Sequence, residues 1–264
     1  MLGFDTTVRL SERRTANILR ALGKRVYYAR DIVRALREPG TWFRETIRQM
    51  RNIGVESVPI ACIVAAFLGG VTAFQTRYQL FPGVQLSVVG LIIRQSIVLE
   101  LGPLLTALVL TGRVGARMTA EIGTMRVTEQ IDALETLSFD PVAYLSLPRV
   151  IAALVMMPAL VVIANATAIF SAWATLVLAT DVRTSDFVEG LRLSFNYFQV
   201  VYSLIKATLF GGAIAFVCSY EGYVTEAGAE GVGRSTATAV VISSVSILVL
   251  DAIVAAVLAP FIQA

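Results

Sequence analysis

The feature that most constrains this chain is the run from residue 150 to residue 180, which contains no charged side chain. Roughly 20 apolar residues in a helix are enough to cross a bilayer core about 30 Å thick. Residues 57–76 form a second uncharged run, and three further apolar runs hold one ionisable residue each, within 95–112, 200–220 and 238–262. The sequence therefore predicts an all-α, polytopic integral membrane protein with five transmembrane helices.

The composition agrees with this class and excludes several kinds of chemistry. Charged residues make up 16% of the chain and the mean hydropathy is +0.72, which is not the composition of a water-soluble domain. The absence of histidine excludes His-based acid/base catalysis and most zinc sites. Cys62 and Cys218 lie inside apolar runs without ligand spacing, so we expect buried thiols and no metal site. No serine has a histidine to activate it, so the chain is not expected to be an enzyme.

The basic residues predict the orientation in the membrane. Residues 1–54 carry twelve Lys/Arg against five acids, and basic flanks stay on the cytoplasmic side. Five crossings then place the N-terminus, residues 113–149 and residues 221–237 in the cytoplasm, and the C-terminus in the periplasm. We divide the chain into a basic segment, 1–54, and a membrane domain, 55–264. Its spans are placed at about 57–76, 87–112, 150–178, 200–220 and 238–262, with the short apolar run 84–93 as a re-entrant or outer-face lead-in to the second span.

The end of the basic segment has the pattern of an amphipathic helix lying in the membrane interface. Apolar residues recur there at helical spacing, and Arg44, Arg48 and Arg51 lie on the other side. The alternative is a basic tail that binds a polyanion such as DNA. Because the basic residues alternate with aromatic ones and lead directly into a span, we expect a membrane surface and no nucleic acid. The apolar residues are Trp42, Phe43, Ile47, Met50 and Ile53.

The connection between the second and third spans is long and acidic. We expect a cytoplasmic helix at about 119–137, because an unstructured loop of this length is uncommon. Glu129, Asp132 and Glu135 would form an acidic stripe on it. Two interpretations remain open: a solvated surface helix, or a docking helix whose apolar stripe enters a groove on a soluble motor. That stripe comprises Ile122, Met125, Ile131, Leu134 and Leu137.

Three ionisable residues lie deep in apolar runs: Glu100, Lys206 and Asp251. Each costs about 2.5 to 3.5 kcal/mol at the middle of a bilayer, so each should face protein or water. They could form a structural ion pair, line the path of a lipid headgroup, or relay protons in a secondary transporter. Pro103, after Gly102, should loosen the helix near Glu100 because it removes a backbone donor.

The segment GAEGVGRS, residues 228–235, imitates a phosphate-binding loop but has Arg234 at the lysine position. A phosphate cradle needs a strand before it and a helix after it, whereas this segment follows an apolar span. We therefore expect a flexible glycine-rich turn between the fourth and fifth spans, and no nucleotide site.

The run ELGPLLTALVLTGRVGARMTAEIGTMRVTEQIDALETLSFDPVAYLSLPRVIA, residues 100–152, resembles the core of the MlaE/YrbE family of ABC-type lipid permeases. The resemblance continues through LIKATLFGGAIAF, GYVTEAGAEGVGRSTATAVV and Asp251, and covers about residues 41–262. It implies that the membrane domain is a permease and that the segment after the second span is the coupling helix of an ATPase subunit. The candidate coupling residues are then Arg117, Glu121, Met125, Arg126, Glu129, Asp132 and Glu135.

The resemblance also implies partners. It implies a bacterial inner-membrane homodimer, a separate ABC ATPase that binds ATP and Mg²⁺, and a periplasmic MCE-domain protein that accepts phospholipid. Some members also have a small STAS-domain protein. No cofactor is implied in this chain. Family members usually have Arg immediately before the Glu of ELGP, but Leu99 stands here and Arg94 is the nearest upstream cation. The candidate residues of the substrate path are Glu100, Arg94, Leu99, Pro103, Lys206 and Asp251.

Overall fold

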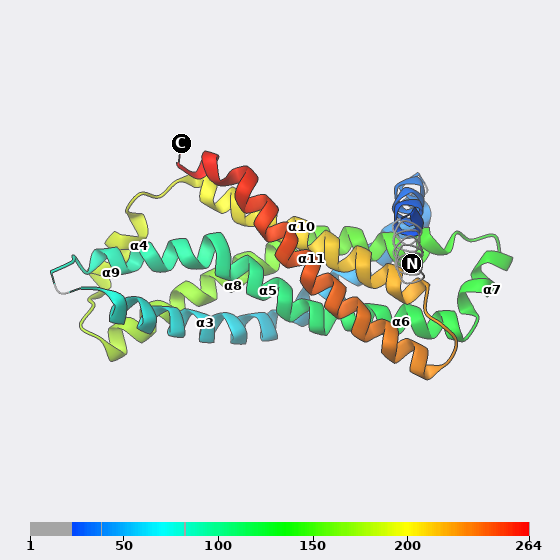
Figure 1. The fold of residues 1–264 in the computed structure, drawn as a ribbon, viewed down its shortest axis with the longest axis horizontal. Coiled ribbons are helices and arrows are strands. Elements are labelled where there is room, and N and C mark those ends of the chain that lie inside the picture. The colour runs from blue at the N-terminus through cyan, green and yellow to red at the C-terminus, as the bar shows by residue number, and fades with distance from the viewer. Residues whose placement is uncertain (1–22, 38, 82, 264) are drawn as a thin grey trace, which may run out of the picture.

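The computed structural model describes residues 23–37, 39–81 and 83–263. In these residues all regular structure is helical, and five helical segments are long and apolar enough to cross a membrane. They run lengthwise through an elongated bundle (Figure 1). The predicted all-α, polytopic membrane fold with five crossings is confirmed. The segments are Gly40–Gln79, Ser87–Val127, Val142–Ala179, Tyr197–Tyr223 and Ala229–Leu258.

The first segment joins an amphipathic helix to an apolar one. α2 (Pro39–Ile53) contains the predicted amphipathic stretch, and a 3-10 turn, η1 (Val55–Ser57), leads from it into the apolar helix α3 (Val58–Gln79). Gly54 lies at the joint, where an added Cβ would come within 2.0 Å of the Met156 side chain. The backbone at this joint therefore packs directly against the third segment.

The second segment is a continuous helical path with two wide turns. It comprises α4 (Ser87–Gln95), the π-helix η2 (Ser96–Leu101), α5 (Gly102–Leu110), the π-helix η3 (Thr111–Gly115) and α6 (Ala116–Val127). The predicted loosening near Pro103 appears as η2, in which the Gly102 amide reaches back to the Ile97 carbonyl. The run 84–93 leads into this segment as α4 rather than standing alone.

The third segment lies at the centre of the bundle. It begins with the π-helix η4 (Val142–Ser146) and continues as α8 (Leu147–Ala179), which packs against α3 on one side and α10 (Tyr197–Tyr223) on the other. Small residues allow the close approach, since a Cβ on Gly69 of α3 would lie 1.9 Å from the Ala168 carbonyl oxygen. α11 (Ala229–Gln263) packs along α10 and α6.

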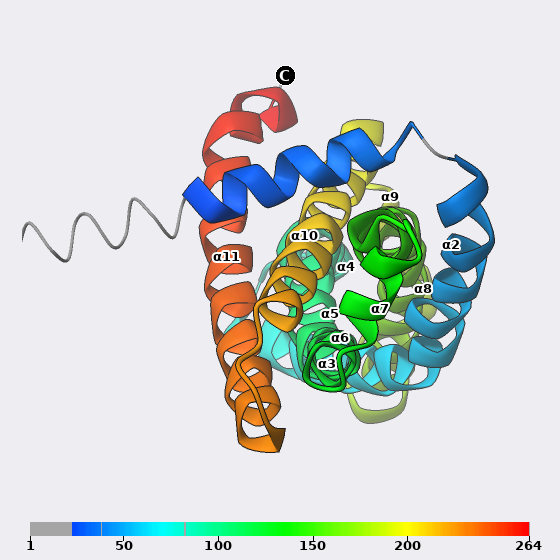
Figure 2. The same ribbon diagram turned by 90° about the vertical axis from the view of Figure 1, so that its right-hand side faces the viewer.

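The two ends of the bundle carry the shorter elements. At one end, α9 (Thr184–Arg192) packs on α4, and the C-terminus lies near this end (Figure 1). At the other end lie α7 (Gln130–Thr136) and the helical residues 23–35, which cross the bundle end beside α10 (Figure 2). The bundle therefore separates the predicted periplasmic elements from the predicted cytoplasmic ones.

Helical residues 23–35 were not predicted. Tyr28, Ile32 and Ala35 of this stretch are buried against Val142 and Tyr220. Arg25 forms an ion pair with Glu221, at 2.8 Å. Burial raises the pKa of the Tyr28 hydroxyl well above its ordinary value. The spacing of the three buried residues, one helical turn apart, was the available signal. Predictions for residues 1–22 lie outside the described residues.

Two predictions about connections are wrong. The glycine-rich segment 228–235 is not a turn, because α11 begins at Ala229 and only Gly228, with a φ of +93°, lies in the connection. The cytoplasmic helix expected at 119–137 is two helices, α6 and α7, separated at Glu129, which has a φ of 59°. A left-handed residue cannot continue an α-helix, so Glu129 precedes α7 as its N-cap, while Asp132 and Glu135 lie within α7 one turn apart.

Candidate functional site

The three intramembrane charges come together at one place in the bundle. Lys206 of α10 has no exposed surface, and its Nζ lies 2.6 Å from Glu100 Oε2 and 2.8 Å from Asp251 Oδ1. The Lys206 Nζ also donates to the Leu99 carbonyl at 3.4 Å. α10, η2 and α11 each contribute one ionisable group. The hydrophobic runs that carry these groups are far apart in sequence, so only the packing of the helices brings them together.

The Glu100 carboxylate is positioned by the wide turn η2. A π-helix holds an extra residue in the turn, and such turns are frequent at functional sites. Tyr202 lies one helical turn before Lys206, and its hydroxyl donates to Glu100 Oε1 at 3.3 Å. Gly102 follows the turn, and a Cβ there would come within 1.8 Å of Asn165 Oδ1 of α8. A glycine at the end of η2 therefore leaves room for the Asn165 side chain of α8.

The exposure of the two carboxylates differs. The Glu100 side chain is 45% exposed, whereas the Asp251 side chain is 18% exposed. One cation between two carboxylates leaves an excess of one negative charge if all three are ionised. Removing one partner from a buried ion pair costs about 3 to 5 kcal/mol, because the other charge is left uncompensated. Lys206 and Asp251 therefore hold the cluster inside the bundle, and Glu100 is the group that reaches its surface.

The other predicted path residues do not all join this cluster. Leu99 contributes its backbone carbonyl, and Pro103 is buried at the start of α5. Arg94 is 4% exposed and its guanidinium turns away, donating to the Gln199 side chain and, at 2.9 Å, to the Leu193 carbonyl. Leu193 ends α9. Arg94 therefore links the connection between α9 and α10 to α4, and it does not pair with Glu100.

The predicted coupling residues lie at the opposite end, on α6 and α7. The two helices are joined across their break by an ion pair between Arg126 and Asp132, at 2.6 Å. Glu129, Asp132 and Glu135 are all exposed, and Glu135 accepts a hydrogen bond from the Tyr223 hydroxyl at 3.4 Å. The charged part of the predicted docking surface is therefore on the outside of the protein.

The predicted apolar stripe is only partly available to a partner. Ile122 and Ile131 are fully buried, because they pack with Leu145 in a small core of their own. Leu137 is 68% exposed and Phe139 is 51% exposed. The expectation that the whole stripe enters a partner's groove is therefore wrong. The apolar residues left for a partner follow α7.

A network of charges connects α6 to the rest of the protein. Arg117 Nε lies 2.8 Å from Glu121 Oε1, and Arg117 Nη1 lies 3.0 Å from Glu56 Oε2 of η1. Glu121 also accepts from Arg149 of α8, at 3.3 Å. Arg117 and Glu121 therefore tie the start of the coupling region to the elements on both sides of it.

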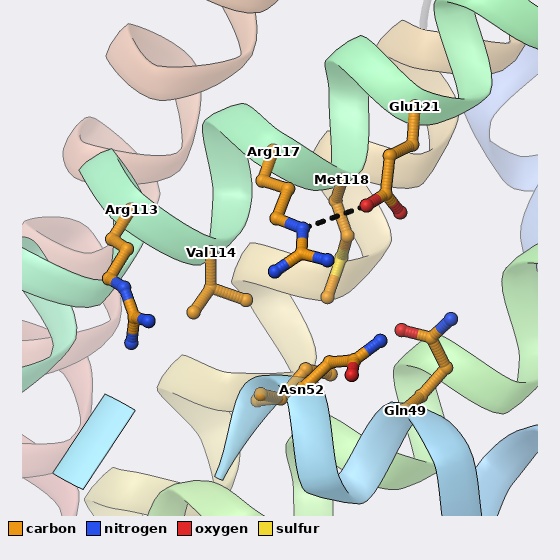
Figure 3. A pocket seen from close by; sticks show the side chains of 8 residues that line it. Gln49, Asn52, Arg113, Val114, Arg117, Met118 and Glu121 are labelled. Atoms are coloured by element: carbon orange, nitrogen blue, oxygen red, sulfur yellow. Dashed lines mark hydrogen bonds and ion pairs between the residues drawn. The ribbon is translucent and has the colours of Figure 1, made fainter. Parts of the chain in front are cut away.

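A small pocket lies beside this network, between α2 and α6. Figure 3 shows Arg113, Arg117 and Glu121 projecting from α6 and the preceding turn toward Gln49 and Asn52 of α2. Its free interior holds about one water molecule. Arg113 donates to the Ser57 hydroxyl at 2.8 Å. The pocket is therefore a tightly packed joint between two helices, too small for a lipid headgroup.

Comparison with known proteins identifies the family. The chain matches the family model described as Permease MlaE over residues 46–257. It is also 37% identical over 239 residues to a probable ABC transporter permease protein of Rickettsia bellii, covering 90% of this chain and 92% of the relative. The chain belongs to the MlaE permease family.

Two other organisms have similar proteins. A probable ABC transporter permease protein of Synechocystis is 40% identical over 211 residues, covering 78% of each chain. The intermembrane phospholipid transport system permease protein MlaE of Haemophilus influenzae is 30% identical over 260 residues, covering 92% of this chain and 97% of that protein. The matched family region contains every candidate residue discussed above.

Sequence reasoning missed several residues of this MlaE-family permease. Tyr202 completes the intramembrane cluster, and its position four residues before Lys206 was a usable signal because such residues share a helix face. Arg149 begins a span and could have been recognised as a cation in need of a carboxylate. The pairing of Glu56 with Arg117 had no local signal, since only tertiary packing brings η1 to α6.

Proposed function

We propose that this permease is the membrane subunit of an ABC transporter that moves phospholipid-like molecules between the inner membrane and a periplasmic MCE-domain carrier. The family match and the names of the relatives support transport by an ABC permease. The observation that carries the proposal is the buried cluster of Lys206, Glu100 and Asp251, with one carboxylate at its surface. The chain itself performs no chemistry in this proposal.

Glu100 is the group that meets the transported headgroup. Its side chain is 45% exposed in a region otherwise apolar, so a lipid moving past it finds one polar contact on a hydrophobic wall. The contacts from Lys206 and Tyr202 hold the carboxylate in place. An ammonium or hydroxyl of a headgroup can pair with the free part of the carboxylate, while the acyl chains remain against apolar residues.

Energy enters through the cytoplasmic end. A separate ATPase, which binds ATP and Mg²⁺, docks on α7 and on the acidic residues around it. Closure of the ATPase moves α6, and the contacts of Arg117 and Glu121 transmit this motion to η1 and α8. Two distant sites can be coupled when both shift the conformation of one connected element. The ion pairs of Arg117 and Glu121 make α6 such an element.

The proposed assembly is a homodimer in the bacterial inner membrane, with cytoplasmic N-termini and periplasmic C-termini. Five helices are few to enclose a lipid path, and a two-fold copy would complete it. The most apolar part of α11 is only 17% buried within one chain, so a large apolar face remains for the second copy and for lipid. A small STAS-domain protein accompanies the ATPase in this proposal.

The test is ATP-dependent exchange of fluorescent phospholipid between liposomes that carry the purified complex and acceptor liposomes. We expect exchange to stop when Glu129, Asp132 and Glu135 are all changed to Lys, because ATPase docking is lost. The matched control changes three acids at the opposite end, Asp181, Asp186 and Glu189, to Lys, and should leave docking intact. Unchanged ATPase binding in the first variant would refute the docking role.

A second candidate is a proton-coupled secondary transporter that uses Glu100, Lys206 and Asp251 as relay groups. A lysine between two carboxylates, as seen here, is an arrangement through which a proton could pass. This candidate requires lipid movement that continues without ATP and stops when a protonophore collapses the proton gradient. ATP-dependent exchange that is insensitive to the protonophore would exclude it.

A further inference from the structure

A groove beside α2 is much larger than the small pocket between α2 and α6. Its lining includes Arg44, Arg48 and Arg51 of α2, with Glu45 among them, and Tyr144 of η4. Its volume is about 780 Å³, which lies within the range of roughly 300 to 1,000 Å³ usual for ligand sites. No candidate residue of transport or coupling lies in this groove.

The groove holds three arginines and one carboxylate, that of Glu45, so its side chains carry an excess of positive charge. Arg117 is paired with both Glu121 and Glu56. In the groove, Glu45 is 3.8 Å from Arg48, and also accepts from Gln49 at 2.9 Å. Within residues 23–37, 39–81 and 83–263, Arg44 and Arg51 have no ion pair.

Next to these arginines α2 also exposes apolar side chains, so the predicted placement of apolar and basic residues on opposite sides of the helix is only partly correct. Phe43 is 61% exposed and Ile47 is 56% exposed, and Ile47 lines the groove. A basic stripe next to an exposed apolar stripe is the pattern of a helix that lies in the headgroup region of a membrane. A solvated helix face would not carry the apolar stripe. α2 continues through η1 into the span α3, so its position is at the membrane surface.

We propose that this groove binds the headgroup of an anionic phospholipid of the cytoplasmic leaflet. Basic pockets beside transmembrane helices on the cytoplasmic side are suited to such lipids. The guanidinium groups bind the phosphate, since arginine can form two parallel hydrogen bonds to it, and the acyl chains lie against Phe43 and Ile47. This resident lipid is separate from the transported one and bridges α2 to η4. The side of the membrane rests on the proposed orientation.

The test measures lipid binding to the purified full-length protein by native mass spectrometry in detergent, with phosphatidylglycerol and phosphatidylcholine as probes. Each basic residue near an anionic lipid contributes about a fivefold gain in affinity, so Arg44→Gln, Arg48→Gln and Arg51→Gln together should weaken phosphatidylglycerol binding on the order of 100-fold. Changing the same arginines to Lys should weaken it by about tenfold, since charge is kept but the paired hydrogen bonds are lost.

The matched control removes equal charge elsewhere on the same side. Lys24, Arg30 and Arg37 are exposed on or just after the helical residues 23–35, and changing all three to Gln should alter affinity by less than about threefold. Equal losses in both triple variants would show general attraction and refute the groove, as would equal binding of phosphatidylcholine. If the triple variant does not fold, the single change Arg51→Gln should still give about a fivefold loss.

Two further measurements test whether free phosphate or a protein, instead of a lipid, binds in the groove. Inorganic phosphate at about ten times the lipid concentration should not displace the lipid, because it lacks acyl chains; displacement would refute a lipid site. Loss of a co-purifying acidic protein from the variant, with lipid binding unchanged, would show a protein-docking surface instead. Neither result depends on transport, so failure of the groove proposal is distinguishable from failure of lipid exchange.

Discussion

Replacing Lys206 with Met tests the energetics of the intramembrane cluster. The side chain has no exposed surface and lies within 2.8 Å of two carboxylates. Loss of one partner of a buried ion pair costs about 3 to 5 kcal/mol, and we expect the lower end because Glu100 is 45% exposed and can be solvated. At about 2 to 4 °C per kcal/mol for a chain of this size, the melting temperature should fall by about 6 to 12 °C.

Most of this cost should come from the Asp251 carboxylate, which is only 18% exposed and would be left without a cation. Adding Asp251→Asn to Lys206→Met should therefore recover most of the loss, whereas Glu100→Gln alone should lower the melting temperature little. The assay is thermal unfolding of the purified protein in detergent, followed by tryptophan fluorescence. An unchanged melting temperature in Lys206→Met, or no recovery in the double variant, would refute the reasoning.

The remaining predictions concern packing and one surface ion pair. Gly190→Ala should lower the stability by about 1 to 3 kcal/mol in the same unfolding assay, because the new Cβ would lie 1.9 Å from the Ser87 carbonyl oxygen; Gly112→Ala, which meets no atom within 4 Å, is the control. The Arg77 guanidinium hydrogen-bonds Asp181 and lowers the pKa of that carboxyl. The stabilisation by this ion pair is therefore fully present above the pKa that the Asp181 carboxyl has in the unfolded chain. It is lost as the pH falls through the lower pKa of Asp181 in the folded protein. In Arg77→Gln the Asp181 carboxyl, followed by carbon-13 NMR, should become protonated at a higher pH than in the wild type; identical titrations would contradict the pairing.

Much of the architecture could be predicted because a bilayer imposes it locally. In a membrane core each backbone polar group must be satisfied within its own segment, so the length and apolarity of a run are sufficient to predict a helix. This is why the uncharged runs at 57–76 and 150–180 and the runs around Glu100, Lys206 and Asp251 predicted five crossings. The positions at which helices begin and end were harder to predict. Glu129 adopts a left-handed conformation that no local pattern required, and Gly231 and Gly233 lie inside α11 despite their low helix propensity.

The number of spans, the family and the three intramembrane charges follow from the amino-acid sequence, because they depend on composition and on motifs that are continuous in the chain. Which groups meet depends on how the helices pack. The packing of α10 against η2 and α11 joins Lys206 to Glu100 and Asp251. Contacts of other helices place Arg94 of α4 against Gln199 and bury Ile122 of α6 with Ile131 and Leu145. Helical periodicity gives each side chain a direction around its own axis, but the neighbour in that direction depends on how separate helices pack.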